Sequence, residues 1–278
     1  MHQGSFCERN RQVIIIREYK KAESLEEAWQ LNQKRSNRII GGMLWLKMSR
    51  QKVQTAIDLS GLGLDGIEES EDSFSIGCMV TLRQLETHEG LHAYTGGAMK
   101  EALRHIVGVQ FRNAATVGGS LYGRYGFSDV LTIFMAMDAQ VELHRGGVMP
   151  LRDFASMPYD RDVLVRVIVP KKPAVYHYQS VRNTDTDFPV LTCGAARTEE
   201  GLRICIGARP GRALLLADPE GLLRAPFPPE KAAQIAAYAA GQIPTGSNLR
   251  GSAAYRTHLV RELTLRAVEH LTQTEREP

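Results

Sequence analysis

Gln110-Phe-Arg-Asn-Ala-Ala-Thr-Val-Gly-Gly-Ser120 is the stretch that decides the fold, and Ile39-Ile-Gly-Gly-Met43 is its shorter counterpart nearer the start of the chain. In each, an apolar β-type stretch runs into a glycine pair, and no short partner strand follows that would make the pair a hairpin turn. Such loops expose bare backbone N–H groups, which bind anions. Two of them on opposite sides could hold a diphosphate without any arginine, although each loop alone is also compatible with an ordinary turn.

The residues before Gly41-Gly42 predict a small βαβ unit. A strand at 13–18 is followed by Ser24-Leu-Glu-Glu27, a capping box that starts a helix running to about residue 34. A second strand at 38–40 runs directly into the glycine pair. The pair therefore lies at the carboxyl end of a strand, where ligands of such units bind.

The rest of the chain predicts an α+β protein whose pattern changes near residue 174. The elements expected before that point are strands at 55–59, 74–77, 141–143, 148–151 and 163–169, and helices opening at Thr81, Ala98 and Ser128. The elements expected after it are a hairpin of strands at 190–197 and 202–206 and helices at 229–240 and 251–271. Gly96-Gly97 and Gly146-Gly147 are interpreted as ordinary turns.

The composition of the chain argues against several classes of protein, namely those that bind nucleic acid, span a membrane or depend on disulfides. The 278 residues are 43% hydrophobic and 23% charged, with 34 Lys+Arg scattered among 31 Asp+Glu, so a nucleic-acid partner is not expected. No apolar run approaches the roughly 18 residues that span a bilayer, and no signal-peptide core is visible. The four cysteines form no CxxC pair and are expected to be reduced thiols. These features predict a cytoplasmic protein that does not contact a membrane.

Gly61-Leu-Gly-Leu-Asp-Gly66 matches the dinucleotide fingerprint GxGxxG, but its context argues against that function. Ile67-Glu-Glu-Ser-Glu-Asp72 places four carboxylates where a pyrophosphate should meet a helix N-terminus. The motifs of P-loop NTPases, zincins and α/β-hydrolases are missing from the sequence, and the histidines share no ligand spacing. No metal site and no hydrolytic chemistry are predicted.

Together with Ser128-Asp-Val-Leu131 and Ala136-Met-Asp-Ala139, the two glycine loops resemble the flavoprotein (medium) subunit of molybdenum hydroxylases, the xanthine dehydrogenase and carbon monoxide dehydrogenase family. The resemblance extends from Ser24-Leu-Glu-Glu-Ala28 to Arg250-Gly-Ser-Ala-Ala-Tyr-Arg256. It implies an α+β fold with a FAD-binding domain of the vanillyl-alcohol-oxidase (PCMH) type at 13–173, built from subdomains at about 13–65 and 66–173. A small C-terminal α+β domain of the CO dehydrogenase flavoprotein type would follow at 174–278.

The resemblance also implies an oxidoreductase subunit that carries electrons through FAD. In the family, electrons come from 2Fe-2S clusters of a small subunit after hydroxylation at the molybdopterin of a large subunit, and FAD passes them to NAD or another acceptor. Holding the flavin requires no acid–base pair, so no catalytic residue is expected. The expected FAD contacts are a first loop (Arg38, Ile39, Ile40, Gly41, Gly42, Met43, Leu44, Trp45), a second loop (Thr116, Val117, Gly118, Gly119, Ser120), Asp129 at the ribose or ribityl hydroxyls, the apolar Ile106 and Leu164, and Gln179 near the flavin.

The chain departs from the family pattern in both loops and near the flavin. Met43 and Leu44 stand where relatives carry hydroxyl and acidic side chains, Ser120 replaces an asparagine, and Gln179 replaces a lysine of many relatives. Each lost neutral hydrogen bond costs about 0.5–1.5 kcal/mol, so FAD affinity is expected to fall by about one to three decades. The alternative function is a FAD-free paralogue that scaffolds the large and small subunits.

Several of these residues have structural interpretations beside the functional ones. Asp129 also fits a helix cap, Trp45 also fits the core, and Arg182 and Asp187 also fit a structural ion pair. Residues 1–12 precede the family-like sequence and are expected to be a disordered extension or to reflect a misassigned start codon.

Overall fold

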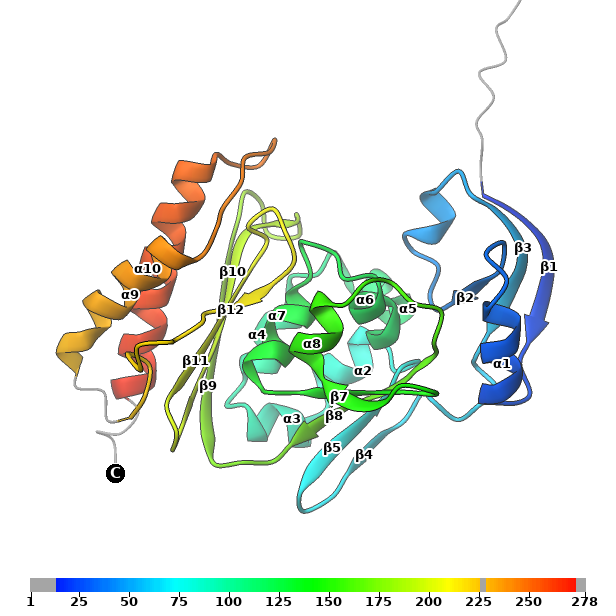
Figure 1. Ribbon diagram of the computed structural model, residues 1–278, viewed down its shortest axis with the longest axis horizontal. Coiled ribbons are helices and arrows are strands. Elements are labelled where there is room, and N and C mark those ends of the chain that lie inside the picture. The colour runs from blue at the N-terminus through cyan, green and yellow to red at the C-terminus, as the bar shows by residue number, and fades with distance from the viewer. Residues whose placement is uncertain (1–13, 226–228, 274–278) are drawn as a thin grey trace, which may run out of the picture.

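The computed structural model describes residues 14–225 and 229–273 and contains three β-sheets (Figure 1). The expectation for residues 1–12 lies outside the described residues. The first sheet is parallel, with β3 between β1 and β2, and it carries the predicted helix and a 3-10 turn. Its elements are β1 (Ile15–Lys21), α1 (Leu25–Asn32), β2 (Arg38–Ile40), η1 (Leu46–Met48) and β3 (Lys52–Asp58).

Local signals set the boundaries of this unit. Ser24 caps α1, because its side chain accepts a hydrogen bond from the Glu27 amide at 3.1 Å. The strand predicted at 38–40 is confirmed as β2, and Gly41 follows it directly. Since β2 is parallel to β3, the glycine pair lies at the carboxyl edge of the sheet, and Figure 1 shows this edge facing the rest of the molecule.

The second sheet is antiparallel, with strand order β4-β5-β8-β6-β7, and helices cover one face of it. Its strands are β4 (Ile67–Glu69), β5 (Ser73–Gly77), β6 (Gln140–Leu143), β7 (Gly147–Pro150) and β8 (Leu164–Pro170). Its helices are α2 (Leu82–Thr87), α3 (Glu89–Tyr94), α4 (Ala98–Arg104), α5 (Val109–Ala114), α6 (Val117–Tyr122), α7 (Asp129–Ala136) and α8 (Leu151–Ser156). Thr81 and Gln84 form the predicted capping box of α2.

Two sequence expectations in this region are corrected. The stretch before the second glycine pair is not β-type, because Val109–Ala114 forms α5, and the pair itself lies inside the first turn of α6. The short elements β4, α3 and α8 were not predicted, since each has six residues or fewer and carries little periodicity. The rejection of the GxGxxG motif agrees with the structure, because strand β4 rather than a helix follows Gly66.

The third sheet is antiparallel, with strand order β12-β11-β10-β9, and it lies between two layers of helices (Figure 1). Its elements are β9 (Ala174–Arg182), β10 (Pro189–Thr198), β11 (Leu202–Gly207), β12 (Leu214–Leu215), η2 (Pro229–Lys231), α9 (Ala232–Gln242) and α10 (Ala253–Gln273). The predicted β10–β11 hairpin and the two C-terminal helices are confirmed, whereas β9 and β12 were not predicted. Residues 189–196 of β10 are all buried, because α10 packs on one face of the sheet and α7 on the other.

Candidate functional site

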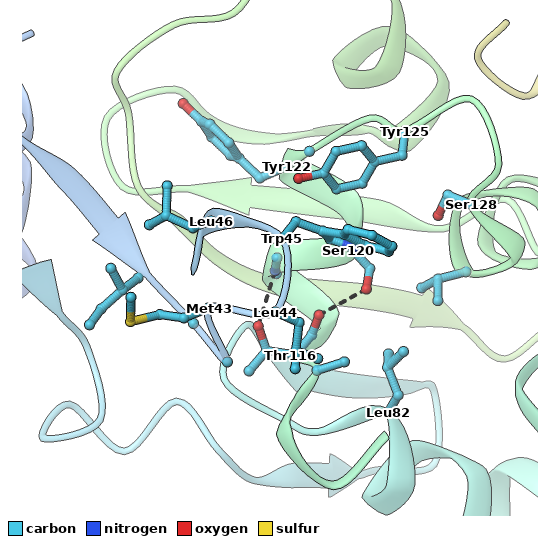
Figure 2. A pocket seen from close by; sticks show the side chains of 18 of the residues that line it. Met43, Leu44, Trp45, Leu46, Leu82, Thr116, Ser120, Tyr122, Tyr125 and Ser128 are labelled. Atoms are coloured by element: carbon cyan, nitrogen blue, oxygen red, sulfur yellow. Dashed lines mark hydrogen bonds between the residues drawn. The ribbon is translucent and has the colours of Figure 1, made fainter. Parts of the chain in front are cut away.

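A cleft of about 1100 Å³ lies where the first sheet, the helices of the second sheet and the β9–β10 turn meet. Figure 2 shows the loop after β2 running through it, with Trp45 pointing toward Tyr125. Fifteen of the seventeen residues proposed from the sequence line this cleft. They are Arg38, Ile39, Ile40, Gly41, Gly42, Met43, Leu44, Trp45, Ile106, Thr116, Gly118, Gly119, Ser120, Asp129 and Leu164.

The first loop supplies unused backbone donors. Within the described part of the chain, the amides of residues 41–45 donate no hydrogen bond to another residue. Met43 adopts a left-handed conformation with φ of +58°, which is uncommon for a residue with a side chain. The loop is therefore a strained turn whose N–H groups are available to an acceptor in the cleft.

The second loop differs from the first, because its amides already have partners. The Val117 amide donates to the Val80 carbonyl at 2.8 Å, and the Gly118 amide donates to the Cys78 carbonyl at 2.8 Å. The Gly119 amide donates to Oγ1 of Thr116, the N-cap of α6, at 3.1 Å. The expectation that both loops present bare amides therefore holds for the first loop only.

Glycine in the first loop permits a close approach of the two parts of the cleft. A Cβ atom added to Gly42 would lie 1.8 Å from the Ala114 carbonyl oxygen, and one added to Gly41 would lie 2.5 Å from Oγ1 of Thr116. The neighbour of Gly42 is backbone, which cannot turn aside. Gly42 thus joins the first sheet to the helix layer as well as lining the cleft.

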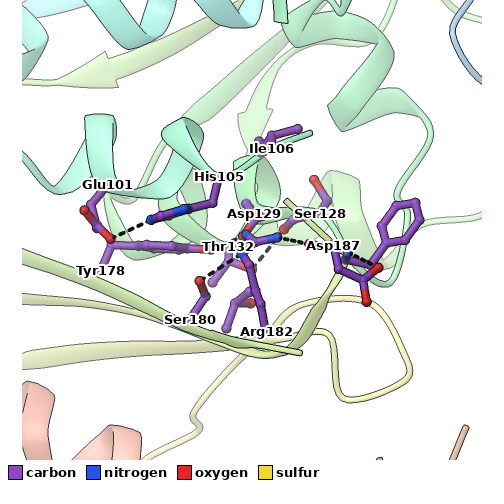
Figure 3. Close-up of polar contacts among 12 residues, drawn as sticks. Glu101, His105, Ile106, Ser128, Asp129, Thr132, Tyr178, Ser180, Arg182 and Asp187 are labelled. Atoms are coloured by element: carbon purple, nitrogen blue, oxygen red, sulfur yellow. Dashed lines mark hydrogen bonds and ion pairs between the residues drawn. The ribbon is translucent and has the colours of Figure 1, made fainter. Parts of the chain in front are cut away.

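Asp129 belongs to a buried polar network beside the cleft, shown in Figure 3. Its Oδ1 accepts hydrogen bonds from the Tyr178 hydroxyl and from Nη2 of Arg182, both at 2.5 Å. Ser128, not Asp129, caps α7 through the Leu131 amide. Burial raises the pKa of the Asp129 carboxyl, and the opposing effects of Arg182 and Tyr178 do not cancel this rise.

Residues 14–172 match the family described as "FAD binding domain in molybdopterin dehydrogenase", and residues 176–271 match the "CO dehydrogenase flavoprotein C-terminal domain". The chain belongs to this family of FAD-binding subunits of molybdenum hydroxylases. FAD is therefore the cofactor of this chain.

Individual relatives agree with the family. The chain is 27% identical over 271 residues to the nicotine 6-hydroxylase medium subunit of Paenarthrobacter nicotinovorans, covering 90% of this chain and 95% of that protein. It is 25% identical over 276 residues to the xanthine dehydrogenase FAD-binding subunit of Escherichia coli O157:H7, covering 90% and 94%. The fold matches carbon monoxide dehydrogenase from Hydrogenophaga pseudoflava with a TM-score of 0.83 and 23% identity, covering 91% and 96%.

Two residues expected to contact FAD do not line the cleft. Val117 is fully buried in the core, and Nε2 of Gln179 donates to the Leu263 carbonyl of α10 at 2.6 Å. Arg182 and Asp187 are joined as expected for a structural pair, but through the Asp187 backbone carbonyl at 2.6 Å. The carboxylate partner of Arg182 is Asp129 instead.

Four aromatic residues at the cleft were missed from the sequence. Trp45 has four ring neighbours, with centroids 5.4 to 6.2 Å away: Phe111, Tyr125, Phe127 and Phe188. All five rings line the cleft, so Trp45 is at once part of a packed cluster and part of the wall. The segment Tyr125-Gly-Phe127, directly before the recognisable Ser128-Asp129, was the signal available in the sequence.

Within the described part of the chain, the cleft offers neither a reactive thiol nor a cluster of metal-binding side chains. Burial raises the pKa of the Cys78 thiol to about 12, so this cleft-lining cysteine stays protonated and unreactive. Among residues 14–225 and 229–273, no three His, Cys, Asp or Glu side chains gather in a way that could hold a metal ion. In the same ranges, no helix combines the length and the apolar character needed to cross a membrane.

Proposed function

We propose that this chain is the medium subunit of a molybdenum hydroxylase complex and carries electrons through FAD from a 2Fe-2S small subunit to NAD or another acceptor. The observation that carries the proposal is the cleft itself, in which a loop with unused amides lies against the start of α6. The names of the relatives, which include a nicotine hydroxylase medium subunit and a xanthine dehydrogenase FAD-binding subunit, support it.

The residues present fit FAD in specific roles. The amides of residues 41–45 would donate to the diphosphate, and the aromatic cluster around Trp45 offers flat apolar surfaces to a ring system. Ile106 and Leu164 would add apolar contacts, and Asp129 would hold Arg182 in place at the edge of the cleft. When bound, FAD would supply the electron-transfer chemistry, and the residues of this cleft would hold the flavin and shield it from water.

We further propose a large molybdopterin-binding partner beside the small one, and a place of action in the cytoplasm. Three cysteines of the described chain, Cys78, Cys193 and Cys205, are buried and form no disulfide, which suits a reducing compartment. The division of the chain near residue 173 is part of the same proposal, because the third sheet begins at Ala174.

A second candidate is the FAD-free scaffold. Two observations favour it: the amides of the second loop are already bonded, and the Asp129 carboxylate already has two donors. In this function the chain would still bind the partner subunits but would hold no cofactor.

Reconstitution separates the two candidates. The purified chain is incubated with FAD, freed of excess by gel filtration, and assayed for flavin released on denaturation. About one FAD per chain supports the electron-transfer function, whereas a folded, flavin-free chain supports the scaffold. Anaerobic addition of NADH to the FAD-loaded protein then tests the acceptor, because bleaching of the flavin absorbance is expected only if NAD is the acceptor.

A further inference from the structure

Arg124, at the end of α6, is a buried cation without a hydrogen-bond partner. The residue is 2% exposed, and its Nε, Nη1 and Nη2 atoms form no hydrogen bond with any residue of 14–225 or 229–273. Its backbone is left-handed, with φ of +45°. A guanidinium has five N–H donors, and burying them all without acceptors is strongly unfavourable. Such a side chain signals an acceptor that joins it in another state of the protein.

Aromatic rings surround this guanidinium. The Arg124 Cζ atom lies 4.1 Å from the ring centroid of Phe154, 4.7 Å from that of Tyr159 and 5.7 Å from that of Tyr122. Cation–π attraction offsets part of the lost hydration but satisfies no N–H donor. Burial lowers the pKa of Arg124. The surrounding rings therefore stabilise the positive charge of Arg124 in part but supply no negative charge to neutralise it.

No carboxylate of the described chain forms an ion pair with Arg124. Asp160 is the acidic residue nearby, and its Oδ1 accepts from the Tyr122 hydroxyl at 3.0 Å. A second guanidinium, that of Arg212, lies 5.5 Å from the ring centroid of Tyr159. Two arginines thus flank one tyrosine ring.

Tyr159 contacts Arg124 and also lines the cleft. It is 58% exposed, whereas Phe154, whose ring also lies against the guanidinium, is fully buried. The Tyr159 hydroxyl donates to the Gly123 carbonyl at 2.7 Å, and its ring packs on Tyr122 with centroids 6.5 Å apart. Tyr122 and Tyr125, on either side of Arg124 in sequence, both line the cleft and are drawn in Figure 2. Rotation of one surface tyrosine would open Arg124 to a ligand there.

We propose that Arg124 is a phosphate-binding residue of the cleft, covered by Tyr159 until a phosphate-bearing ligand enters. The inference rests on the proposed function, which supplies FAD and its diphosphate as the ligand. Of the two glycine loops, the first offers unused amides, and a planar guanidinium adds the positive charge and the paired donors that a phosphate group takes. Movement of Tyr159 would break its hydrogen bond to the Gly123 carbonyl and its ring contacts with Tyr122 and Arg212.

The test compares Arg124→Met with wild type by titration calorimetry, using FAD, inorganic pyrophosphate and riboflavin as separate probes. Arg145→Met is the matched control, because Arg145 also lies over an aromatic ring, that of Trp29 at 4.8 Å, but is exposed and outside the cleft. Arg124→Met is expected to bind FAD and pyrophosphate about 10- to 100-fold more weakly and riboflavin as tightly as wild type. Arg145→Met should bind all three like wild type. Unchanged pyrophosphate and FAD affinity in Arg124→Met would overturn the proposal.

Two further outcomes keep the test decisive. If wild type binds no FAD but binds pyrophosphate through Arg124, the proposed function fails and the phosphate site stands. If wild type and Arg124→Met bind FAD equally, the phosphate site fails and the proposed function stands.

Should Arg124→Met not fold, Tyr159→Ala replaces it, and removal of the covering ring is expected to tighten pyrophosphate binding. Unchanged or weaker binding by Tyr159→Ala overturns the proposal.

Discussion

Gly42→Ala should separate the role of this residue in packing from its role in binding FAD. The added Cβ would lie 1.8 Å from the Ala114 carbonyl oxygen, and ordinary contact begins at 3.4 Å. The first loop and α5 must therefore move apart by about 1.6 Å. Overpacking of this kind typically costs 1–3 kcal/mol, and a backbone neighbour places Gly42 toward the upper end, at about 2–3 kcal/mol.

This cost can be measured as a change in thermal stability. For a chain of this size, 1 kcal/mol corresponds to about 2–4 °C, so the melting temperature should fall by roughly 4–12 °C. The displaced loop would also lose its hydrogen-bond geometry toward FAD, so flavin content should fall in the same variant. Circular dichroism of the FAD-free protein and flavin released on denaturation provide the two measurements.

Gly66→Ala is the matched control, because a Cβ on Gly66 meets no atom within 4 Å. This variant should melt at or slightly above the wild-type temperature, since alanine restricts the unfolded chain. Wild-type stability together with wild-type flavin content in Gly42→Ala would refute the packing role assigned to Gly42.

Three further variants test the site and the fold. In Gly119→Val, the added Cβ would meet Oγ1 of Thr116 at 3.0 Å, and the residue lines the cleft, so the protein should fold but lose FAD. Full flavin content would contradict the placement of the second loop. Asp129→Asn breaks the buried ion pair with Arg182, so the FAD-free protein should lose about 3–5 kcal/mol of stability. Its melting temperature should fall by roughly 6 °C or more. If Asp129 only contacted the cofactor, the melting temperature of the FAD-free protein would not change. Burial and the neighbouring His270 lower the pKa of His177 from 6.5 to about 4. The contribution of His177 to stability should therefore be complete above about pH 6.5 and decline as the pH falls toward 4. His177→Gln should flatten that decline in melting curves recorded across this range, and an unchanged slope would exclude His177 as its source.

The parts of the fold that the sequence predicted well are those fixed by neighbours in the chain. Ser24, Thr81 and Ser128 each accept from an amide three residues later, and each begins the helix expected there. The strand at 38–40 and its glycine pair were found for the same reason, since three apolar or extended residues followed by two glycines are a local signal.

The interpretation of 107–116 as β-type failed because its apolar residues face different partners. Val109 is exposed and Arg112 is buried, the reverse of what their polarity suggests. Arg112 is buried because Glu86 of α2 accepts from its Nε at 2.7 Å. A pair separated by 26 residues leaves no trace in a local pattern, so the helix was not visible in the sequence.

The candidate site shows the same division. The sequence alone determined which family the chain resembles and which two loops and which aspartate lie at the cleft, because those features are short motifs in a fixed order. Only the tertiary structure decided that the amides of one loop are free while those of the other are bonded, that Asp129 pairs with Arg182, and that Arg124 lies unpartnered behind Tyr159. The physical reason is that hydrogen bonds and charge pairing depend on atoms brought together from distant segments, whereas capping and glycine turns depend on residues only a few positions apart.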